Sequence, residues 1–333
     1  MRAMLARQPG GLDKLELVDL PEPGAPGAGE ILVRLRASSL NYHDYLVAAR
    51  GLAEDRRVPM SDGAGEVLAV GQGVSEFAVG DRVVSTFFPT WIDGPGRLDD
   101  MASVPGDGVD GYARELAVMP AAGFTRAPAG YSHAEAATLT CAGVTAWRAL
   151  VPHGPVSPGQ TVLVMGTGGV SIIALQLAKA MGASVIATSS SDEKLERLKA
   201  LGADHVVNYR TTEAWGRKVF ELSDGGVDHV VEVGGPGTLG QSMEATRVHG
   251  HIALIGVLTG FQGPVNTGLL MTRQIRLQGV IVGSRRDQLD LVRAVEANAI
   301  KPVIDRNYPL EALAEAFRHQ ESGRHFGKIC VDI

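Results

Sequence analysis

The sequence predicts an α/β protein with two domains, one of which is a doubly wound parallel sheet. From Ser132 to Val257, apolar runs of strand length alternate with helical stretches, a pattern typical of a parallel sheet with helices on both faces. Before Ser132, the runs are short and β-type and are separated by Gly and Pro, which favours a mostly β domain. The length of 333 residues fits two domains of ordinary size.

The first part of the chain contains β-type runs such as ELVDLPEP, EILVRLRASSL and GAGEVLAVG. One helix is expected there, around Asn41–Arg50. The stretch Phe87–Asp110 is rich in Gly, Pro and Asp and has little periodicity. We therefore expect a long loop, and long loops in compact domains often carry function.

The second part opens with SHAEAATLTCAGVTAWRAL, an Ala-rich stretch with helical spacing. Ser132 is a candidate N-cap, because Glu135 three residues later completes a capping box. Strands are expected at TVLVMG, SVIATSS, HVVNY, DHVVEVGG and HIALIGV, and helices at SIIALQLAKAMGA, at DEKLERLKALGA and between the last two strands. After Gly260 we expect one more strand at IRLQGVIVG, amphipathic helices at DQLDLVRAVEANAI and LEALAEAFRHQES, and a final strand at FGKICVDI.

Composition limits the classes of function. The net charge of -6, with no long run of one sign, argues against a nucleic-acid partner. No apolar run approaches the length of a membrane span, and the start of the chain has no signal-peptide pattern, so we expect a cytoplasmic protein without a membrane partner. Two cysteines, Cys141 and Cys330, are too few for a disulfide framework or a four-cysteine zinc site.

A glycine-rich turn within TVLVMGTGGVSIIALQLAKAMGA predicts a dinucleotide-binding site. Gly166, Gly168 and Gly169, followed by Val170, approximate the G-x-G-x-x-G pattern, with Ser171 in the third Gly position. The first Gly makes the tight turn, and the second lets the backbone approach a pyrophosphate that rests on the helix N-terminus. The alternative is a Gly-rich turn that binds nothing.

The end of the next strand favours NADPH over NADH. An NAD enzyme usually carries Asp or Glu there to bind the ribose 2′-OH, whereas this chain has Ser189, Ser190 and Ser191. Hydroxyls and the nearby Lys194 suit a 2′-phosphate, which a carboxylate would repel. One of the serines is also expected to cap the following helix.

With these motifs the chain resembles the medium-chain dehydrogenase/reductase superfamily, and within it the zinc-independent quinone oxidoreductase-like branch. The resemblance rests on SSLNYHDYL, GAGEVLAVGQGVSEFAVGDRV, GYARELAV, AATLTCAGVTAWRAL, VLVMGTGGVS and HFGKICVDI, which together span nearly the whole chain. It implies a GroES-like, mostly β catalytic domain over residues 1–125, to which residues 265–333 return. It also implies a Rossmann NADP-binding domain over residues 126–264.

Departures from the zinc-dependent members imply that both zinc sites of those relatives are absent. In the resemblance, Asn41 replaces the first Cys ligand, Ser61 replaces the His ligand, and Asp62 replaces a neighbouring Glu. Only Cys141 remains at a ligand position, whereas catalytic zinc needs about three protein ligands. The lobe that carries structural-zinc cysteines in those relatives has none here. We therefore expect no metal, and we expect Cys141 to be a small buried side chain.

The resemblance also implies roles for individual residues. It places Asn41, Tyr42, His43 and Asp44 at the mouth of the catalytic cleft, with Tyr42 near the cofactor pyrophosphate, His43 at a proton-relay position and Asp44 orienting the site. Groups expected near the nicotinamide are Thr145 and the backbone of Gly256, Val257, Val282, Gly283 and Ser284. Tyr209 and Lys194 would hold the 2′-phosphate, and Lys328 would reach a phosphate oxygen. Simpler interpretations are a surface His43, a helix-capping Asp44 and a solvated Lys328.

Together these expectations describe an NADPH-dependent, zinc-free reductase of quinones, enones or related small carbonyl compounds. Without a metal, a hydrogen bond must stabilise the developing oxyanion. Asn41, Tyr42, His43 or a cofactor hydroxyl could donate it, and the proton could come from His43 or from water. The alternatives are a zinc-type alcohol dehydrogenase and a catalytically idle NADPH-binding sensor protein, because a fold does not dictate a function. The resemblance also implies a homo-oligomer that pairs through the IRLQGVIVG edge strand.

Overall fold

The computed structural model describes all 333 residues, which divide into two compact units. Unit 1 comprises Met1–Val144 and Val282–Ile333, and unit 2 comprises Thr145–Ile281. The chain thus leaves unit 1 once, forms unit 2, and returns to unit 1.

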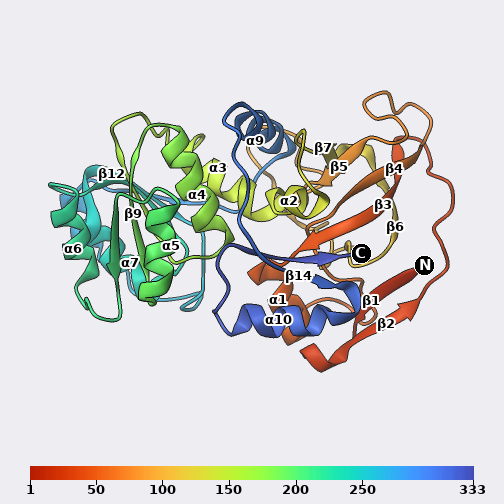
Figure 1. The fold of residues 1–333 in the computed structure, drawn as a ribbon, viewed down its shortest axis with the longest axis horizontal. Coiled ribbons are helices and arrows are strands. Elements are labelled where there is room, and N and C mark those ends of the chain that lie inside the picture. Colours follow the sequence, from red (N-terminus) through yellow and green to blue (C-terminus); the bar gives the residue numbers. More distant parts are fainter. The chain divides into compact units, whose positions relative to one another are not determined.

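Unit 1 is built on a mostly antiparallel sheet that the C-terminal strand completes (Figure 1). Its strands are β1 (Arg2–Ala6), β2 (Leu15–Asp19), β3 (Glu30–Ser39), β4 (Ala64–Val70), β5 (Arg82–Ser85), β6 (Leu116–Pro120), β7 (Phe124–Arg126), β14 (Ile304–Pro309) and β15 (Lys328–Asp332). β1 and β2 pair separately, and the others follow the order β14-β15-β3-β4-β5-β7, with β6 also on β3. β15 pairs antiparallel with β3, Cys330 opposite Ser39, which brings Lys328 close to the end of β3.

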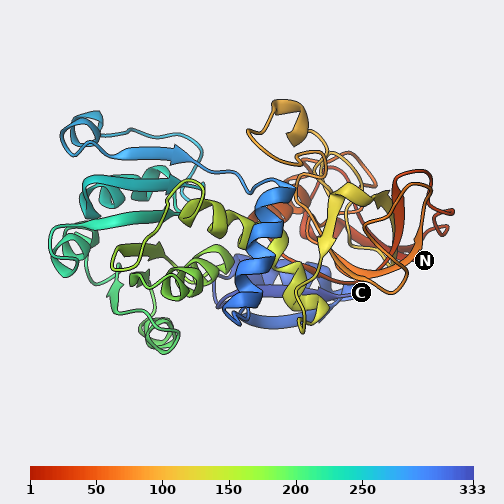
Figure 2. The ribbon, with the colours of Figure 1, turned by 90° about the horizontal axis from the view of Figure 1, so that it is seen from above.

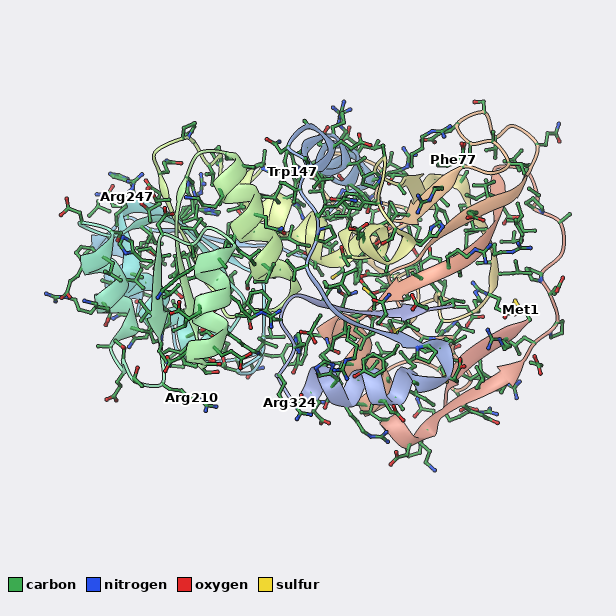
Figure 3. The ribbon with its side chains drawn as sticks, in the orientation of Figure 1. Met1, Phe77, Trp147, Arg210, Arg247 and Arg324 are labelled. Atoms are coloured by element: carbon green, nitrogen blue, oxygen red, sulfur yellow. The ribbon has the colours of Figure 1, made fainter.

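Alternation along β3 builds one core of unit 1. Ile31, Val33 and Leu35 are buried on one face and pack in a cluster with Phe124. Phe77, labelled in Figure 3, joins the same cluster. The helices of this unit are α1 (Tyr42–Arg50), α2 (His133–Ala137), α9 (Arg285–Ala297) and α10 (Leu313–Glu321).

Local sequence signals account for most helix boundaries in unit 1. α1 begins after Asn41 and ends at Gly51, whose φ of 61° is left-handed, a conformation that glycine adopts without steric cost. Ser132 caps α2, with its hydroxyl accepting from the Glu135 N–H, so the expected capping box is confirmed. The long helix expected after Ser132 is instead interrupted by a π-helical turn at Leu139–Gly143, before α3 (Val144–Leu150). Residues 87–110 contain only one short 3-10 helix, at Leu98–Met101.

Unit 2 contains six parallel strands in the order β10-β9-β8-β11-β12-β13. They are β8 (Thr161–Met165), β9 (Ser184–Ser189), β10 (His205–Asn208), β11 (Val227–Glu232), β12 (Thr246–Leu254) and β13 (Arg276–Gly279). In chain order this is 3-2-1-4-5-6, the order of the Rossmann fold, in which ligands bind where the strand order reverses. The reversal lies between β8 and β11. Figure 2 shows β13 at the margin of the sheet.

Helices connect the strands of unit 2. They are α4 (Gly169–Ala180), α5 (Asp192–Ala200), α6 (Trp215–Leu222), α7 (Pro236–Ala245) and α8 (Thr267–Thr272). Right-handed crossovers in a sheet of this order place α4 and α5 on one face and α6 and α7 on the other. The sequence did not predict α6 or α8. The strands contribute Leu163, Ile186, Val230 and Ile252 to the core, all fully or almost fully buried.

The expected domain boundaries, 125/126 and 264/265, fall before those of the compact units. α2 packs on β3 and β4 and therefore belongs to unit 1. β13 pairs with β12 and extends unit 2 beyond residue 264. No helix combines the length and the apolar character needed to cross a bilayer.

Candidate functional site

The N-terminus of α1 is tied to the segment before β4 by one buried carboxylate. Asp44 accepts the Asn41 backbone N–H at 2.9 Å through Oδ2 and the Ser61 N–H at 2.8 Å through Oδ1. The side chain is 1% exposed. Asp44 is therefore a helix cap that also fixes Asn41 and Ser61 relative to each other.

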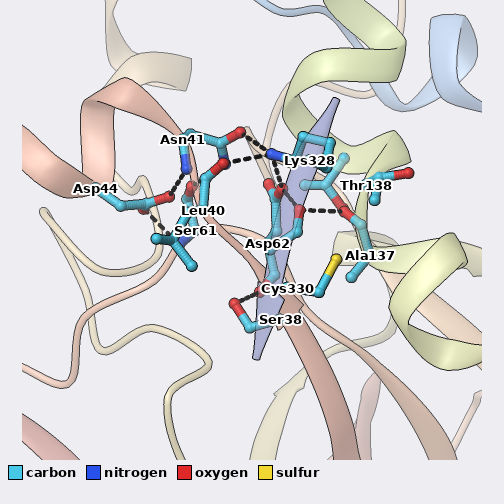
Figure 4. A network of polar contacts seen from close by, with 12 residues as sticks. Ser38, Leu40, Asn41, Asp44, Ser61, Asp62, Ala137, Thr138, Lys328 and Cys330 are labelled. Carbon is cyan, nitrogen blue, oxygen red and sulfur yellow. Dashed lines mark hydrogen bonds and ion pairs between the residues drawn. The ribbon is translucent and has the colours of Figure 1, made fainter. Parts of the chain in front are cut away.

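Lys328 lies in the middle of a buried polar network (Figure 4). Its ammonium donates to Leu40 O at 2.5 Å and to Asn41 Oδ1 at 2.6 Å, and it lies 3.5 Å from Asp62 Oδ2. The side chain is 3% exposed, so the simpler interpretation of Lys328 as a solvated lysine is wrong. Its expected contact with a cofactor phosphate stays a prediction.

Asp62 is the anionic member of this network and has no solvent exposure. Its Oδ2 accepts the Ser39 hydroxyl at 2.5 Å, whereas its Oδ1 has no hydrogen-bond partner. Burial raises the pKa of the Asp62 carboxyl, and the Lys328 ammonium opposes this increase. Burial likewise raises the pKa of the nearby Cys330 thiol to about 12, which leaves that side chain an unreactive part of the core.

His43 faces the loop of residues 87–110. Its Nε2 lies 3.6 Å from Asp107 Oδ2, and its ring meets the Phe87 ring edge-on with centroids 5.5 Å apart. His43 is half-buried, so it is not a freely solvated surface histidine. Tyr42, also half-buried, lies beside Tyr45, with ring centroids 6.0 Å apart.

Cys141 lies in the π-helical turn and is half-buried, so the expectation of full burial was wrong. π-turns within helices are frequent at functional sites. In the whole chain, no three His, Cys, Asp or Glu side chains are grouped in a way that could hold a metal ion.

In unit 2, the glycine-rich turn joins β8 to α4 as the dinucleotide fingerprint requires. Gly166 has a φ of 74°. Gly168 is the N-cap of α4, and Gly169 and Val170 are the first two residues of this helix. A Cβ added at Gly166 or at Gly168 would meet no heavy atom within 4 Å. The turn thus has open space beside the positive end of the helix, where a pyrophosphate binds. Ser171 fits the third Gly position because its hydroxyl donates to Met165 O at 2.6 Å.

At the tip of β9, hydrogen bonds connect Ser189 with Tyr209 and Ser191 with Lys194. Ser189 ends the strand, and the Tyr209 N–H donates to its carbonyl at 3.1 Å, so that the two residues are neighbours. Ser190 is half-buried, and Ser191 caps α5 by accepting the Lys194 N–H at 3.4 Å. Capping by one serine of the run is confirmed.

Asp192 is a carboxylate at this tip that the sequence analysis missed. It lies in the first turn of α5, and its Oδ1 accepts the Asn208 side-chain N–H at 2.7 Å. Asp192 directly follows Ser191, the N-cap of α5, and this position in the sequence was a signal that could have identified it.

Gly256 and Val257 lie beside a largely apolar cavity of about 490 Å³ at the ends of β12 and β13. A Cβ at Gly256 would lie 1.7 Å from Val233 O, so only glycine fits this close approach of two loops. Buried Glu232 organises the neighbouring loop, because its Oε1 accepts the N–H groups of Gly234 and Gly235 at 2.7 and 3.0 Å. Sequence reasoning missed Glu232, although a carboxylate inside an apolar strand was a visible signal.

The remaining expected residues lie where the chain passes between the units. Thr145 is buried in α3. Val282 has a φ of 30°, an uncommon conformation for a β-branched residue and one that often marks a functional site. Ser284, after Gly283, is the N-cap of α9, and its hydroxyl donates to Asp287 at 2.7 Å.

Comparisons with known proteins cover nearly the whole chain. A profile described as the alcohol dehydrogenase GroES-like domain matches residues 27–129, and one described as a zinc-binding dehydrogenase matches residues 169–297. A zinc-type alcohol dehydrogenase-like protein of Schizosaccharomyces pombe is 41% identical over 334 residues, 97% of this chain and 96% of the relative.

Solved structures agree in fold. A proposed alcohol dehydrogenase from Sinorhizobium meliloti 1021 is similar with a TM-score of 0.93 at 44% identity, covering 100% of this chain and 98% of the other. An NAD-dependent alcohol dehydrogenase is similar with a TM-score of 0.90 at 37% identity, covering 100% of both chains.

Proposed function

Because the chain belongs to the medium-chain dehydrogenase/reductase superfamily of oxidoreductases, we propose that it is an NADPH-dependent reductase that works without zinc. We assign it to the quinone oxidoreductase-like branch, with quinones, enones or related small carbonyl compounds as substrates. The observation that carries the proposal is the Lys328 ammonium, which contacts Asn41 and Asp62 at positions that the resemblance assigns to the metal site of relatives.

The residues at these positions do not fit catalytic zinc. Asn41 Oδ1 accepts from Lys328, and Ser61 Oγ accepts the Asn41 Nδ2–H at 3.3 Å. Both oxygens are therefore engaged in hydrogen bonds within the protein and are not oriented to coordinate a metal ion. Zinc prefers Cys, His and carboxylate ligands, and only Asp62 and Cys141 remain of these types. A buried ammonium beside Asp62 also repels a second cation. The zinc-binding dehydrogenase profile matches residues 169–297, which include none of these positions.

Unit 2, in contrast, fits a nicotinamide dinucleotide. Gly166 and Gly168 leave the space beside the α4 N-terminus that a pyrophosphate needs. When bound, the nicotinamide supplies a hydride to an electrophilic carbon. The protein itself supplies position, hydrogen bonds and a proton.

The choice of NADPH rests on the tip of β9. Ser189 and Tyr209 are neighbours there, and no carboxylate takes the usual place of the NAD-selective Asp or Glu. Asp192 is a carboxylate near this tip and would disfavour a 2′-phosphate, although one of its oxygens already accepts a hydrogen bond from Asn208.

In unit 1, Asn41 and His43 have the chemistry that the reaction needs. Reduction of an enone or quinone adds one hydride and one proton, and negative charge develops on the substrate oxygen. Asn41 Nδ2 is an N–H donor for that oxygen. The His43 imidazole is the general acid that delivers the proton. Asp44 holds Asn41 in place.

An NADPH-consumption screen over quinones, enals and aldehydes tests the proposal. Protein purified without added metal should oxidise NADPH with at least one conjugated carbonyl compound. It should do so faster than it oxidises any simple alcohol, because alcohol oxidation needs the acidified hydroxyl that zinc normally provides. Treatment with a chelator should leave the rate unchanged, and metal analysis should find no stoichiometric zinc.

The names of the relatives favour a second candidate, a zinc-type alcohol dehydrogenase. Chelator-sensitive oxidation of ethanol or benzyl alcohol would support that function instead. NADPH binding without turnover of any compound in the screen would favour an idle NADPH-binding sensor.

A further inference from the structure

We propose that Lys328 is the resident cation of the catalytic pocket and that it acts through Asn41. It is a positioning residue that holds the amide with Oδ1 inward, so that Nδ2 donates to the substrate oxygen. This inference rests on the proposed function and names the device that takes over the task of the metal.

The orientation of the amide follows from the chemistry of the lysine. An ammonium has only donors, so the Asn41 atom 2.6 Å from Nζ is the carbonyl oxygen. The nitrogen consequently points the other way, where it lies 3.3 Å from Ser61 Oγ. The Ser61 hydroxyl can donate or accept and so does not distinguish the two orientations, whereas the Lys328 ammonium does.

The cation is also fixed in its place. Leu40 O, Asn41 Oδ1 and Asp62 Oδ2 surround Nζ, and the side chain is 3% exposed. Asp62 has no exposure and would be an unpaired buried carboxylate without this partner, which is costly. The network thus joins β15, the start of α1 and the segment before β4 around one positive charge (Figure 4).

The charge has a catalytic consequence. A hydrogen bond from an ammonium to the amide oxygen polarises the amide, and polarised chains donate more strongly at their far end. In zinc-dependent chemistry the metal polarises the substrate oxygen directly. Here the Lys328 ammonium polarises the substrate oxygen through the Asn41 amide, so the site needs no metal ion.

Kinetics of four variants test the inference. Asn41→Asp keeps an oxygen near Lys328 but removes the donor, and kcat should fall by roughly 10²–10³-fold, as for loss of one oxyanion donor. Lys328→Met should lower kcat by about tenfold or more, with the NADPH dissociation constant unchanged in fluorescence titration. Lys328→Arg should recover part of the loss. Lys14→Met, at an exposed lysine of the same unit, is the matched control and should retain wild-type kcat.

Lys328→Met alone leaves Asp62 unpaired and can fail to fold, so Lys328→Met/Asp62→Asn provides the second test. This variant removes the Lys328 cation and the Asp62 carboxylate together and should unfold at a higher temperature than Lys328→Met. It should still show the reduced kcat. Wild-type kcat in the double variant would overturn the inference.

A spectroscopic measurement separates this inference from the proposed function. The side-chain amide signal of Asn41 in a ¹⁵N–¹H spectrum is assigned by its loss in Asn41→Asp. Its two protons should be distinct in the wild type and should shift and broaden in the double variant. An unchanged signal there would refute the role of Lys328, even if no compound in the screen were reduced. A changed signal with no turnover of any compound would refute the proposed function alone.

Discussion

The side chains of His43 and Asp107 are neighbours in unit 1, with His43 Nε2 3.6 Å from Asp107 Oδ2. His43 lies on the first turn of α1, and Asp107 comes from the loop of residues 87–110. Phe87, from the same loop, covers the imidazole edge-on. The loop therefore contributes a carboxylate and an apolar wall to the proposed general acid, which gives this otherwise irregular segment a definite role.

Replacement of His43 by Gln should lower kcat by roughly 10²–10⁴-fold, the usual contribution of a general acid. Asp107→Asn should have a smaller effect, about fivefold, because a half-exposed ion pair contributes at most about 1 kcal/mol. Asp93→Asn, at an exposed position of the same loop, is the control. Wild-type kcat in His43→Gln would argue for water as the proton donor.

Cofactor selectivity should depend on Ser189. Ser189→Asp should reverse much of an NADPH preference, because a carboxylate repels the 2′-phosphate and accepts the ribose 2′-OH. A hydrogen bond to a charged group is worth roughly 1.5–3 kcal/mol, about tenfold to over a hundredfold in binding. Titration with NADPH and NADH measures the change.

The control for this experiment lies on the same strand. Ser184→Asp places the same charge at the exposed opposite end of β9 and should leave selectivity unchanged. Equal affinity of the wild type for both cofactors would contradict the proposal and would direct attention to Asp192.

Oligomerisation should depend on β13, the edge strand of the unit 2 sheet. Its outer edge has unpaired backbone groups, and Ile281 beyond it is 49% exposed. Such an edge is a template for pairing with a second copy. Light scattering at micromolar concentration should give a dimer or tetramer for the wild type and a smaller species for Ile281→Asp. A monomeric wild type would reject this expectation.

Sequence reasoning succeeded where the signal is local. The glycine turn at Gly166, the Ser132–Glu135 capping box and the Ser191 cap each depend on residues within a few positions of one another, and the structure contains all three. The alternation of strands and helices likewise predicted the doubly wound sheet.

Long-range pairing was beyond the sequence. Lys328 meets Asn41 and Asp62 only because β15 pairs with β3, and no local pattern encodes that contact. Asp107 reaches His43 through a loop without periodicity. The π-turn at Cys141 was missed because its composition does not differ from that of an ordinary helix.

A histidine pair in unit 2 should make this unit sensitive to acid. His229 and His251 are register partners on β11 and β12, both buried, with their Nδ1 atoms 3.5 Å apart. Burial lowers the pKa of His229 to about 4 and that of His251 to about 3. Around them, Asp228 favours the charged form of His229, whereas Arg247, Arg276 and His153 oppose protonation. Gln160 Oε1 accepts from His229 Nε2 at 3.1 Å.

The sign of the effect follows from these directions. Both pKa values are lower in the folded state than the unfolded value of 6.5, so the unfolded chain binds more protons below that pH. The free energy of unfolding should therefore fall as the pH falls from about 6.5 toward 4, by roughly 3 kcal/mol for His229 alone at 1.36 kcal/mol per pKa unit. Urea unfolding of the full chain at several pH values, followed by fluorescence, measures this slope. His229→Asn and His251→Asn should each flatten it, whereas His249→Asn, at an exposed position of β12, should leave it unchanged. A slope equal in all four proteins would show that acid sensitivity arises elsewhere, because a variant that lacks one buried histidine should lose the share of the slope that this histidine contributes.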